Sequence, residues 1–246
     1  MAYPASPHTT RTAANRTVAT VTAVWQLTPR MTRVRLGGES LAGLAATPGQ
    51  TIKIYVPDLA TGLPVSRDYT VRDANPAQPS LDIDIVLHGE GAAANWARRA
   101  RPGQTLEFAG PSGRYRPDPR ADWHLFAGDE TALPAIQAYV GMLPATAQAL
   151  LYLEVADPAE EQPMPGPARP RVCWLHRGGR PGGTLPLLEQ AVRAAPLPPG
   201  RGRIWLAGHT PTVRRIRTYL LTERGVEHSA LYVKGYWDRR RVLDAR

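Results

Sequence analysis

Short β-branched and apolar runs, separated by turn residues, fill the first half of the chain. They predict strands over residues 16–24, 31–36, 51–57, 80–88 and 104–110. In the run SLDIDIVLH, apolar side chains alternate with polar ones, which places Asp82 and Asp84 on a solvated face opposite a buried face. Short strands with this alternation and with Gly/Pro turns predict an antiparallel barrel or sandwich. One helix, GAAANWARRA at residues 91–100, interrupts the strands.

The rhythm changes after the prolines Pro117 and Pro119. Apolar strands are predicted at 123–128, 147–156, 171–176, 202–208 and 228–237, and helices at 131–143, 184–195 and 210–225. Alternating apolar strands and helices predict a parallel sheet covered on both faces. We therefore expect a disordered lead-in over residues 1–16, a β-barrel domain over 17–118 and an α/β domain over 119–246. The Pro-rich loop from Asp157 to Pro170 is expected to be mobile.

Two strand ends of the predicted parallel sheet carry polar residues before a helix. They are AGDETALPA, residues 127–135, and LAGHTPT, residues 206–212. Ligands of open α/β sheets lie at the carboxyl ends of the strands. Asp129 or Thr131 would cap the first helix and Thr210 the second, and the helix N-termini would offer N–H groups to phosphates. Each turn taken alone also fits an ordinary βα connection, and no G-x-G-x-x-G or Walker motif is present.

The stretch SRDYTVRD sets Arg67, Tyr69 and Thr70 close together. Residues two apart in a strand share a face, so Arg67 and Tyr69 should point one way and Thr70 the other. A guanidinium grips phosphate bidentately, and a phenol ring can stack on a flat heterocycle. This spacing would suit a flavin nucleotide, although an ordinary strand with one exposed arginine fits the same residues.

Composition narrows the partners further. The chain has 246 residues and a net charge of +9, which favours anionic partners. Lysine occurs only at Lys53 and Lys234, and the single cysteine, Cys173, favours a reducing, cytoplasmic location. No apolar run approaches the roughly 20 residues of a membrane span, and no nucleic-acid-binding signature or metal-ligand spacing occurs. We expect a cytoplasmic monomer without a metal site, a nucleic-acid partner or a membrane span.

Five motifs taken together resemble one family. SRDYTVRD, LDIDIVLHGEG, AGPSG, AGDETALPAI and GYW occur in this order between about Thr17 and Trp237. They are similar to the motifs of the siderophore-interacting proteins, which are flavin-dependent ferric-siderophore reductases of the ferredoxin-reductase superfamily. The resemblance implies an N-terminal FAD-binding barrel and a C-terminal NAD(P)-binding α/β domain, with FAD and NAD(P)H as cofactors.

The resemblance also implies site residues. Arg67 would lie near the FAD pyrophosphate, Tyr69 against the isoalloxazine and Thr70 near its reactive edge. A second group of FAD contacts would come from His88, Gly91, Ala93, Ala94 and Trp96. The turn where the two nucleotides meet would consist of Asp129, Glu130, Thr131 and Ala132. Lys53 matches a basic position that the family associates with its substrate. If the C-terminal segment folds back over the barrel, Lys234, Arg239 and Arg241 would join Lys53 as basic side chains for an anionic substrate. It implies no catalytic side chain and no metal ligand.

The leading hypothesis is therefore reduction of a ferric siderophore by NAD(P)H through FAD. The chain departs from the family pattern at Ala94, His209 and Asp238, which keeps open a specialised flavoenzyme or flavin reductase acting on an organic acceptor. A non-enzymatic flavin- or nucleotide-binding protein is the third hypothesis. Arg177 and Arg180 follow a strand and would either meet the 2′-phosphate of NADPH or remain solvated in a loop.

Overall fold

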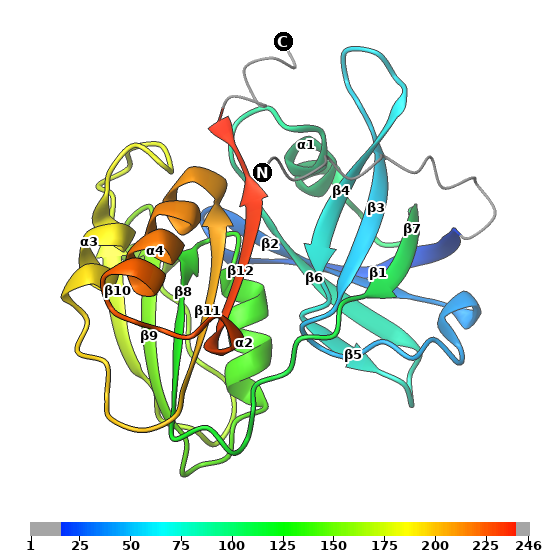
Figure 1. Cartoon of the computed structure of the whole chain (residues 1–246). Helices are drawn as coiled ribbons and strands as arrows, with labels where there is room; N and C mark the ends of the chain where they lie inside the picture. Colours follow the sequence, from blue (N-terminus) through cyan, green and yellow to red (C-terminus); the bar gives the residue numbers. More distant parts are fainter. Residues whose placement is uncertain (1–15, 240–246) are drawn as a thin grey trace, which may run out of the picture.

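The computed structural model describes residues 16–239. The expected lead-in, apart from Arg16, and the end of the basic C-terminal segment, residues 240–246, lie outside the described residues. Two sheets make up the fold, one antiparallel and one parallel (Figure 1). Residues 113–122 connect them, and the proposed division at residue 118 falls within this connection.

The first sheet is antiparallel and has seven strands in the order β4-β3-β7-β1-β2-β6-β5. Its elements are β1 (Thr17–Thr28), β2 (Met31–Gly37), β3 (Thr51–Pro57), β4 (Pro64–Thr70), β5 (Asp73–Asn75), β6 (Ser80–Val86) and β7 (Thr105–Ser112), with the helix α1 (Ala92–Arg99) between β6 and β7 and the short 3-10 helix η2 (Glu39–Leu41) after β2.

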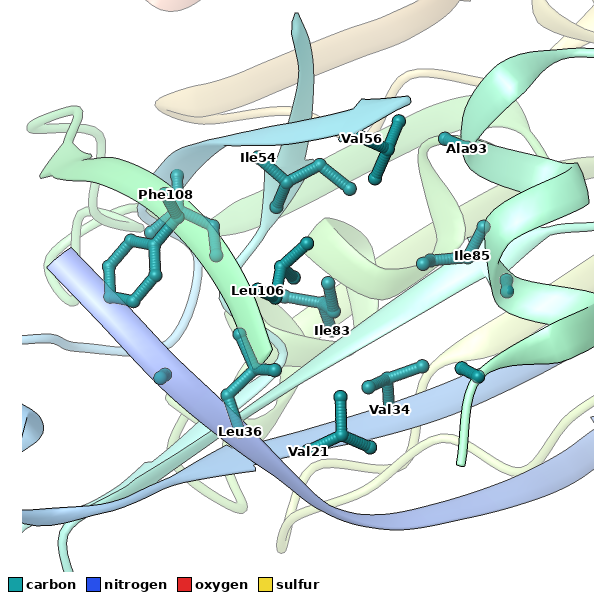
Figure 2. Close-up of a cluster of buried hydrophobic side chains, with 14 of the residues drawn as sticks. Val21, Val34, Leu36, Ile54, Val56, Ile83, Ile85, Ala93, Leu106 and Phe108 are labelled. Carbon is teal, nitrogen blue, oxygen red and sulfur yellow. The ribbon is translucent and has the colours of Figure 1, made fainter. Parts of the chain in front are cut away.

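The two edge strands of this sheet, β4 and β5, are joined by only Val71 and Arg72, so the sheet curls until its edges approach each other. Val71 donates its N–H to Gln50 at 2.7 Å, and Arg72 donates to Asp82 at 2.8 Å. Inward-pointing apolar side chains fill the resulting barrel, and Ala93 of α1 reaches the same core (Figure 2). The antiparallel barrel expected from the sequence is confirmed.

The second sheet is parallel, with the strand order β10-β9-β8-β11-β12. Its strands are β8 (Trp123–Asp129), β9 (Gln148–Val155), β10 (Arg171–His176), β11 (Gly202–His209) and β12 (Leu231–Trp237). Its helices are α2 (Leu133–Gly141), α3 (Leu187–Ala194) and α4 (Thr210–Thr222), with the 3-10 helices η3 (Pro158–Glu160) and η4 (His228–Ala230). Helix α2 packs on the face toward the barrel, whereas α3 and α4 cover the other face (Figure 1).

Both faces of strand β6 are buried, which corrects one expectation. Asp82 and Asp84 are each only 3% exposed, although the alternating pattern placed them on a solvated face. Arg35 and Arg33 on the neighbouring strand β2 bind them bidentately, at 2.7 and 2.8 Å and at 2.6 and 2.8 Å. Buried carboxylates need such partners, and the pairing lies across strands about 50 residues apart, where sequence periodicity cannot detect it.

The barrel and the α/β domain share a packed interface. Met31 and Val86 of the barrel belong to the same buried cluster as Leu133, Ile136 and other α2 side chains. The phenol of Tyr139 donates to the carbonyl of Gly49 at 2.9 Å, and a Cβ added at Gly49 would lie 2.3 Å from its ring. Glycine at position 49 therefore allows the close approach of the two domains.

The Pro-rich loop from Asp157 to Pro170 is part of this interface, so the expectation that it is mobile is wrong. Thr28 of the barrel donates to Glu160 of the loop at 2.6 Å, and both residues are buried. Gln162 lies 3.2 Å from the sulfur of Met31, and Ala168 joins the shared core. These contacts anchor the loop at the domain interface, and its Pro-rich composition gives no indication of them.

Candidate functional site

Strand β4 arranges Arg67, Tyr69 and Thr70 as their spacing predicts. In the β3–β4 register, Tyr69 lies opposite Ile52 and Arg67 opposite Ile54, whose side chains face the barrel interior. Thr70 lies opposite Thr51 on the outer face. Because β4 is an edge strand, Arg67 is exposed while Tyr69 packs against the barrel core. The Arg67 guanidinium donates only to the carbonyl of Ser66, at 2.8 Å, within the part of the chain that the structure describes.

Helix α1 begins with an N-terminus suited to an anion. Gly91 is the N-cap and has no side chain, and the first turn carries no acidic residue. The first intrahelical hydrogen bond runs from Asn95 to Gly91, and no hydrogen bond within residues 16–239 uses the N–H groups of Ala92, Ala93 or Ala94. Unsatisfied N–H groups at a helix N-terminus bind phosphate groups. This end of α1 therefore offers the free N–H donors that a pyrophosphate requires.

The loop before α1 is held by the helix itself. Asn95 donates to the carbonyl of Glu90 at 2.8 Å, and Arg98 donates to the carbonyl of Gly89 at 3.0 Å. His88 is exposed at the start of this loop. Surrounding protein atoms, and secondarily Arg98, lower the pKa of His88, whereas Glu130 of the other domain opposes this shift. His88 is therefore neutral near pH 7 and lies at the junction of the two domains. Trp96, also expected at the flavin, packs against the barrel core.

Asp129 occupies the point where the parallel sheet reverses its strand order, between β8 and β11. One carboxylate oxygen accepts from the N–H and the hydroxyl of Thr131, and the other accepts from His209 N and Trp237 Nε1, both at 2.8 Å. A Cβ at Gly208 would lie 2.5 Å from this carboxylate. Burial, with Glu130 nearby, raises the pKa of Asp129 to about 6. Asp129 thus fastens three strand ends together, and its side chain is fully used by protein donors.

The expected helix caps differ from the structure. Helix α2 starts at Leu133 after Ala132, and neither Asp129 nor Thr131 accepts a bond from its first turn. Thr210 is the first residue of α4, and its hydroxyl donates to the carbonyl of Trp237 at 2.9 Å instead of capping the helix. These side chains bind neighbouring strand ends because the carboxyl edge of the sheet brings β11 and β12 within reach.

Arg177 is buried in a cluster of carboxylates and is not available for a 2′-phosphate. It is 3% exposed and binds Glu130 bidentately at 2.6 and 2.7 Å, with Glu154 at 3.4 Å. Both alternatives for Arg177, a contact with the 2′-phosphate of NADPH and a solvated loop position, are therefore wrong, because ion pairs with residues distant in sequence occupy its guanidinium. Arg180 is exposed in the following loop. Glu130, expected at the cofactor turn, orients Arg177 through this pair.

Glu154 makes stability depend on pH. Burial outweighs the nearby Arg177 and raises the pKa of Glu154 to about 7, from an ordinary value of 4.5. The folded protein then holds a proton that the unfolded chain has lost, so the free energy of unfolding should fall as pH rises from about 4.5 to 7. In urea unfolding across this range, Glu154→Gln should show a shallower decline than the wild type. The control Glu227→Gln, at an exposed position, should keep the wild-type slope; equal slopes in all three proteins would contradict the assignment.

Trp237, part of the GYW motif, packs against residues that its motif does not identify. The Trp237 ring lies 4.7 Å from the His209 ring, measured between centroids, and a Cβ at Gly182 would lie 3.1 Å from it. His209 Nδ1 is 2.9 Å from the hydroxyl of Thr212. His209, a departure from the family pattern, therefore supports Trp237 and the glycine-rich loop from inside the fold. The run RGGRPGG was the one visible hint of close packing here.

Two of the basic residues expected at the substrate, Lys53 and Lys234, lie near the same end of strand β3. Lys53 pairs with Asp68 at 2.6 Å on the outer barrel face, and both side chains are about half exposed, at 46% and 54%. Lys234 reaches across the interface to the hydroxyl of Thr51 at 3.4 Å, two residues before Lys53 on the same strand face. Arg239 is exposed, and its charge lowers the pKa of His209 in addition to the larger effect of burial. Arg241 lies outside the described residues.

Strand β12 makes a second contact with the barrel through Tyr236. Burial raises the pKa of Tyr236, the nearby Thr70 side chain partly opposes this shift, and Lys234 lies 5.4 Å from the Tyr236 ring. The two lysines, Tyr236 and Thr70 therefore gather where the last strand meets β3 and β4. Among residues 16–239, no helix is long and apolar enough to cross a membrane, and no group of His, Cys, Asp and Glu side chains is arranged to hold a metal.

Comparisons with known proteins agree with this arrangement. Residues 60–115 match the siderophore-interacting FAD-binding domain, and residues 121–240 match the family described as siderophore-interacting protein. The ferric vibriobactin reductase ViuB of Vibrio cholerae is 34% identical over 231 residues, which cover 84% of this chain and 83% of ViuB. An uncharacterised protein of Mycobacterium tuberculosis is 41% identical over 190 residues, which cover 73% and 67% of the two chains.

Solved structures share the fold over nearly the whole chain. A siderophore utilization protein from T. fusca has a TM-score of 0.85 and 36% identity, with 92% of this chain and 93% of that chain covered. More distant structures, such as the FAD/NAD-binding domain of a nitric oxide dioxygenase from Vibrio cholerae (15% identity, TM-score 0.71, 90% and 98% covered), show the fold alone. The expected FAD-binding barrel is confirmed at the level of the family. Because of these matches to the family models and to ViuB, we conclude that the chain belongs to the siderophore-interacting protein family.

Proposed function

We propose that this protein is an FAD-dependent oxidoreductase that takes a hydride from NAD(P)H and reduces a ferric siderophore. One observation carries the proposal most directly. Arg67, which forms no ion pair within residues 16–239, and the free N-terminus of α1 both belong to the barrel that matches an FAD-binding domain, and Lys53 and Lys234 approach the same end of β3. The 34% identity to a ferric vibriobactin reductase supports the same activity.

The barrel residues would hold FAD in a fixed orientation. Arg67 and the N–H groups of Ala92, Ala93 and Ala94 would neutralise the pyrophosphate, since both are free of protein partners in the described chain. Tyr69 packs on the barrel core, which would keep its ring rigid beside a flat heterocycle. When bound, FAD accepts two electrons as a hydride and passes them on singly, which links a nicotinamide donor to one-electron acceptors such as ferric iron.

The carboxyl edge of the parallel sheet would receive the nicotinamide nucleotide. Ligands of such sheets bind outside the strand ends where the strand order reverses. In this chain Asp129 and Glu130 are engaged within the protein, so we assign them to shaping this edge. Because Arg177 is buried, only Arg180 is left of the two arginines that would favour NADPH over NADH.

An anionic ferric chelate would be attracted by Lys53 and Lys234. Lys53→Ala should therefore raise KM for a ferric catecholate siderophore, with little change in the rate of flavin reduction by NAD(P)H. Asp68→Asn should lower KM, because it removes the carboxylate that competes for Lys53 at 2.6 Å. Exposed charges interact weakly, so we expect changes of about twofold to fivefold, and both should shrink as salt screens them over about 8 Å. Opposite signs for the two variants are the decisive feature; if both raise KM or neither changes it, Lys53 is not part of the substrate site.

The alternative of a specialised flavoenzyme loses part of its motivation. His209 was one of three departures from the family pattern, and the structure places its ring inside the fold against Trp237 and Thr212. The histidine at position 209 therefore contributes to packing at the carboxyl edge of the parallel sheet. Ala94 leaves the helix N–H groups in place, so the flavin site does not depend on a hydroxyl there.

A ferrous-trap assay tests the proposed activity. Purified protein, NADH or NADPH, and a ferric catecholate siderophore are mixed without oxygen, and a ferrous chelator reports the product. The proposal predicts colour that requires protein, nicotinamide and siderophore together. Reduction of an organic acceptor but of no ferric siderophore would select the alternative, and a flavin that neither nicotinamide bleaches would indicate a non-enzymatic binding protein.

A further inference from the structure

We propose that the groove between helix α4 and the outer edge of strand β12 binds an extended acidic segment of a partner protein, which adds to β12 as a further strand. This inference is independent of the proposed redox activity. Residues of α4 and β12 line the groove, and α4 covers the face of the parallel sheet away from the barrel (Figure 1).

The groove combines apolar side chains with polar ones, of which the two arginines, Arg214 and Arg217, form what we call its basic rim. Its volume is about 780 Å³. Val213, Leu231 and Val233 contribute apolar surface, and the polar side chains on it include Arg214, Arg217 and His228. No Asp or Glu lines it. A volume of this order accommodates a short segment of chain, and a rim of one sign of charge selects the opposite sign.

The two arginines of the rim are not neutralised. Within residues 16–239, neither Arg214 nor Arg217 forms an ion pair with a carboxylate, and Arg217 donates only to His228 Nε2, at 2.8 Å. Their neighbour Arg215, on another face of the same helix, is bound by Glu189 at 2.6 Å. Arg214 and Arg217 are three residues apart on α4, so they project along the same side of the helix. Two unpaired guanidinium groups are therefore presented to whatever enters the groove.

Strand β12 contributes a backbone edge to the same groove. The groove is lined by the consecutive residues Leu231, Tyr232 and Val233. Because neighbouring side chains of a strand point to opposite faces, the groove borders the backbone edge of β12 as well as one of its faces. In the described chain β12 pairs with β11 alone, which leaves one row of N–H and C=O groups unpaired. The strand contains no proline, and its one lysine turns toward Thr51 of the barrel. Such an edge accepts an added strand, whose alternate side chains would then face α4.

Charge identifies the occupant as an acidic partner. The chain's own residues 1–15 contain no Asp or Glu, and residues 240–246 contain three arginines and one aspartate. A second copy of the chain carries a net charge of +9. Neither complements the basic rim. A segment with acidic residues at alternate positions and apolar residues between them would place carboxylates at Arg214 and Arg217 and apolar groups beside the exposed Tyr232.

A peptide-binding experiment tests this inference. The probe is a fluorescein-labelled hexapeptide that alternates valine and glutamate, titrated with the full-length protein while anisotropy is recorded. Binding should weaken at least tenfold in the Arg214→Ala/Arg217→Ala double variant and change less than twofold in Arg215→Ala. A matched peptide with lysine in place of glutamate should not bind. Hydrogen exchange should show new protection of β12 amides only with the acidic peptide.

Three results would overturn the proposal. The first is no saturable binding of the acidic peptide to the wild-type protein. The second is equal loss of binding in the double variant and in Arg215→Ala, which would indicate attraction to general positive charge. The third is displacement by citrate at the same concentration as unlabelled peptide, without protection of β12, which would make the groove a site for small anions.

Discussion

Replacing Arg177 with methionine is expected to lower the free energy of unfolding by about 3–5 kcal/mol, the cost of leaving buried charges without their partner. The guanidinium is 2% exposed and binds Glu130 and Glu154, while Asp129 lies beside Glu130. Methionine preserves much of the volume but none of the charge. Urea unfolding at pH 7.5, followed by circular dichroism, measures the loss.

The matched control is Arg180→Met, three residues further along in the exposed loop. The backbone carbonyl of Arg180 accepts a hydrogen bond from Arg177 Nε at 3.2 Å, and the substitution of the side chain leaves that carbonyl in place. We expect a change within about 0.5 kcal/mol for this variant. The defect of Arg177→Met should also shrink toward pH 5.5, because burial already raises the pKa values of Glu154 and Asp129 and protonation relieves their repulsion. A loss below about 1 kcal/mol at pH 7.5 would show that the ion pairs add little.

Replacing Arg67 with alanine is expected to weaken FAD binding by about ten- to a hundredfold, since a hydrogen bond to a charged group contributes roughly 1.5–3 kcal/mol. The guanidinium has no carboxylate partner in the described chain, so the variant removes a ligand contact and no protein ion pair. Fluorescence titration of the apoprotein with FAD gives the dissociation constant directly.

Arg99→Ala is the control for this prediction. Arg99 is exposed in the last turn of α1. Its substitution removes the same charge from the same domain, at the end of the helix opposite to the proposed pyrophosphate site. Its dissociation constant should stay within about threefold of wild type, as expected for screened charges at a distance. Full flavin occupancy of purified Arg67→Ala, with an unchanged dissociation constant, would remove Arg67 from the flavin site.

Local patterns predicted the elements well because they depend on neighbours in sequence. Strands β3 and β10 have the bounds that their apolar runs predict, and β4 presents Arg67 and Tyr69 on one face as a two-residue period requires. The order of strands and helices after Pro119 was enough to predict the parallel sheet. The same local reasoning placed Lys53 on a barrel strand, where the structure has it.

The sequence did not predict which polar side chains bind residues that are distant in the chain. Asp82 and Asp84 read as solvated because nothing in their own strand shows that β2 supplies Arg35 and Arg33. Arg177 looked free for a phosphate, since Glu130 and Glu154 precede it by 47 and 23 residues. The contact between Tyr236 and Thr70 likewise forms only when the last strand docks on the barrel. In each case a polar side chain was assigned to solvent or ligand and was found bound within the protein.

The electron balance of the purified protein tests the central claim most directly. Under anaerobic conditions, the visible spectrum is recorded as NADH or NADPH is added, followed by a ferric catecholate siderophore in small steps. The proposed function predicts flavin absorbance that one of the nicotinamides bleaches and that returns in full after two equivalents of ferric siderophore, with two equivalents of ferrous iron trapped. A preparation that binds FAD and is bleached, but whose absorbance does not return with any ferric siderophore, would contradict the account.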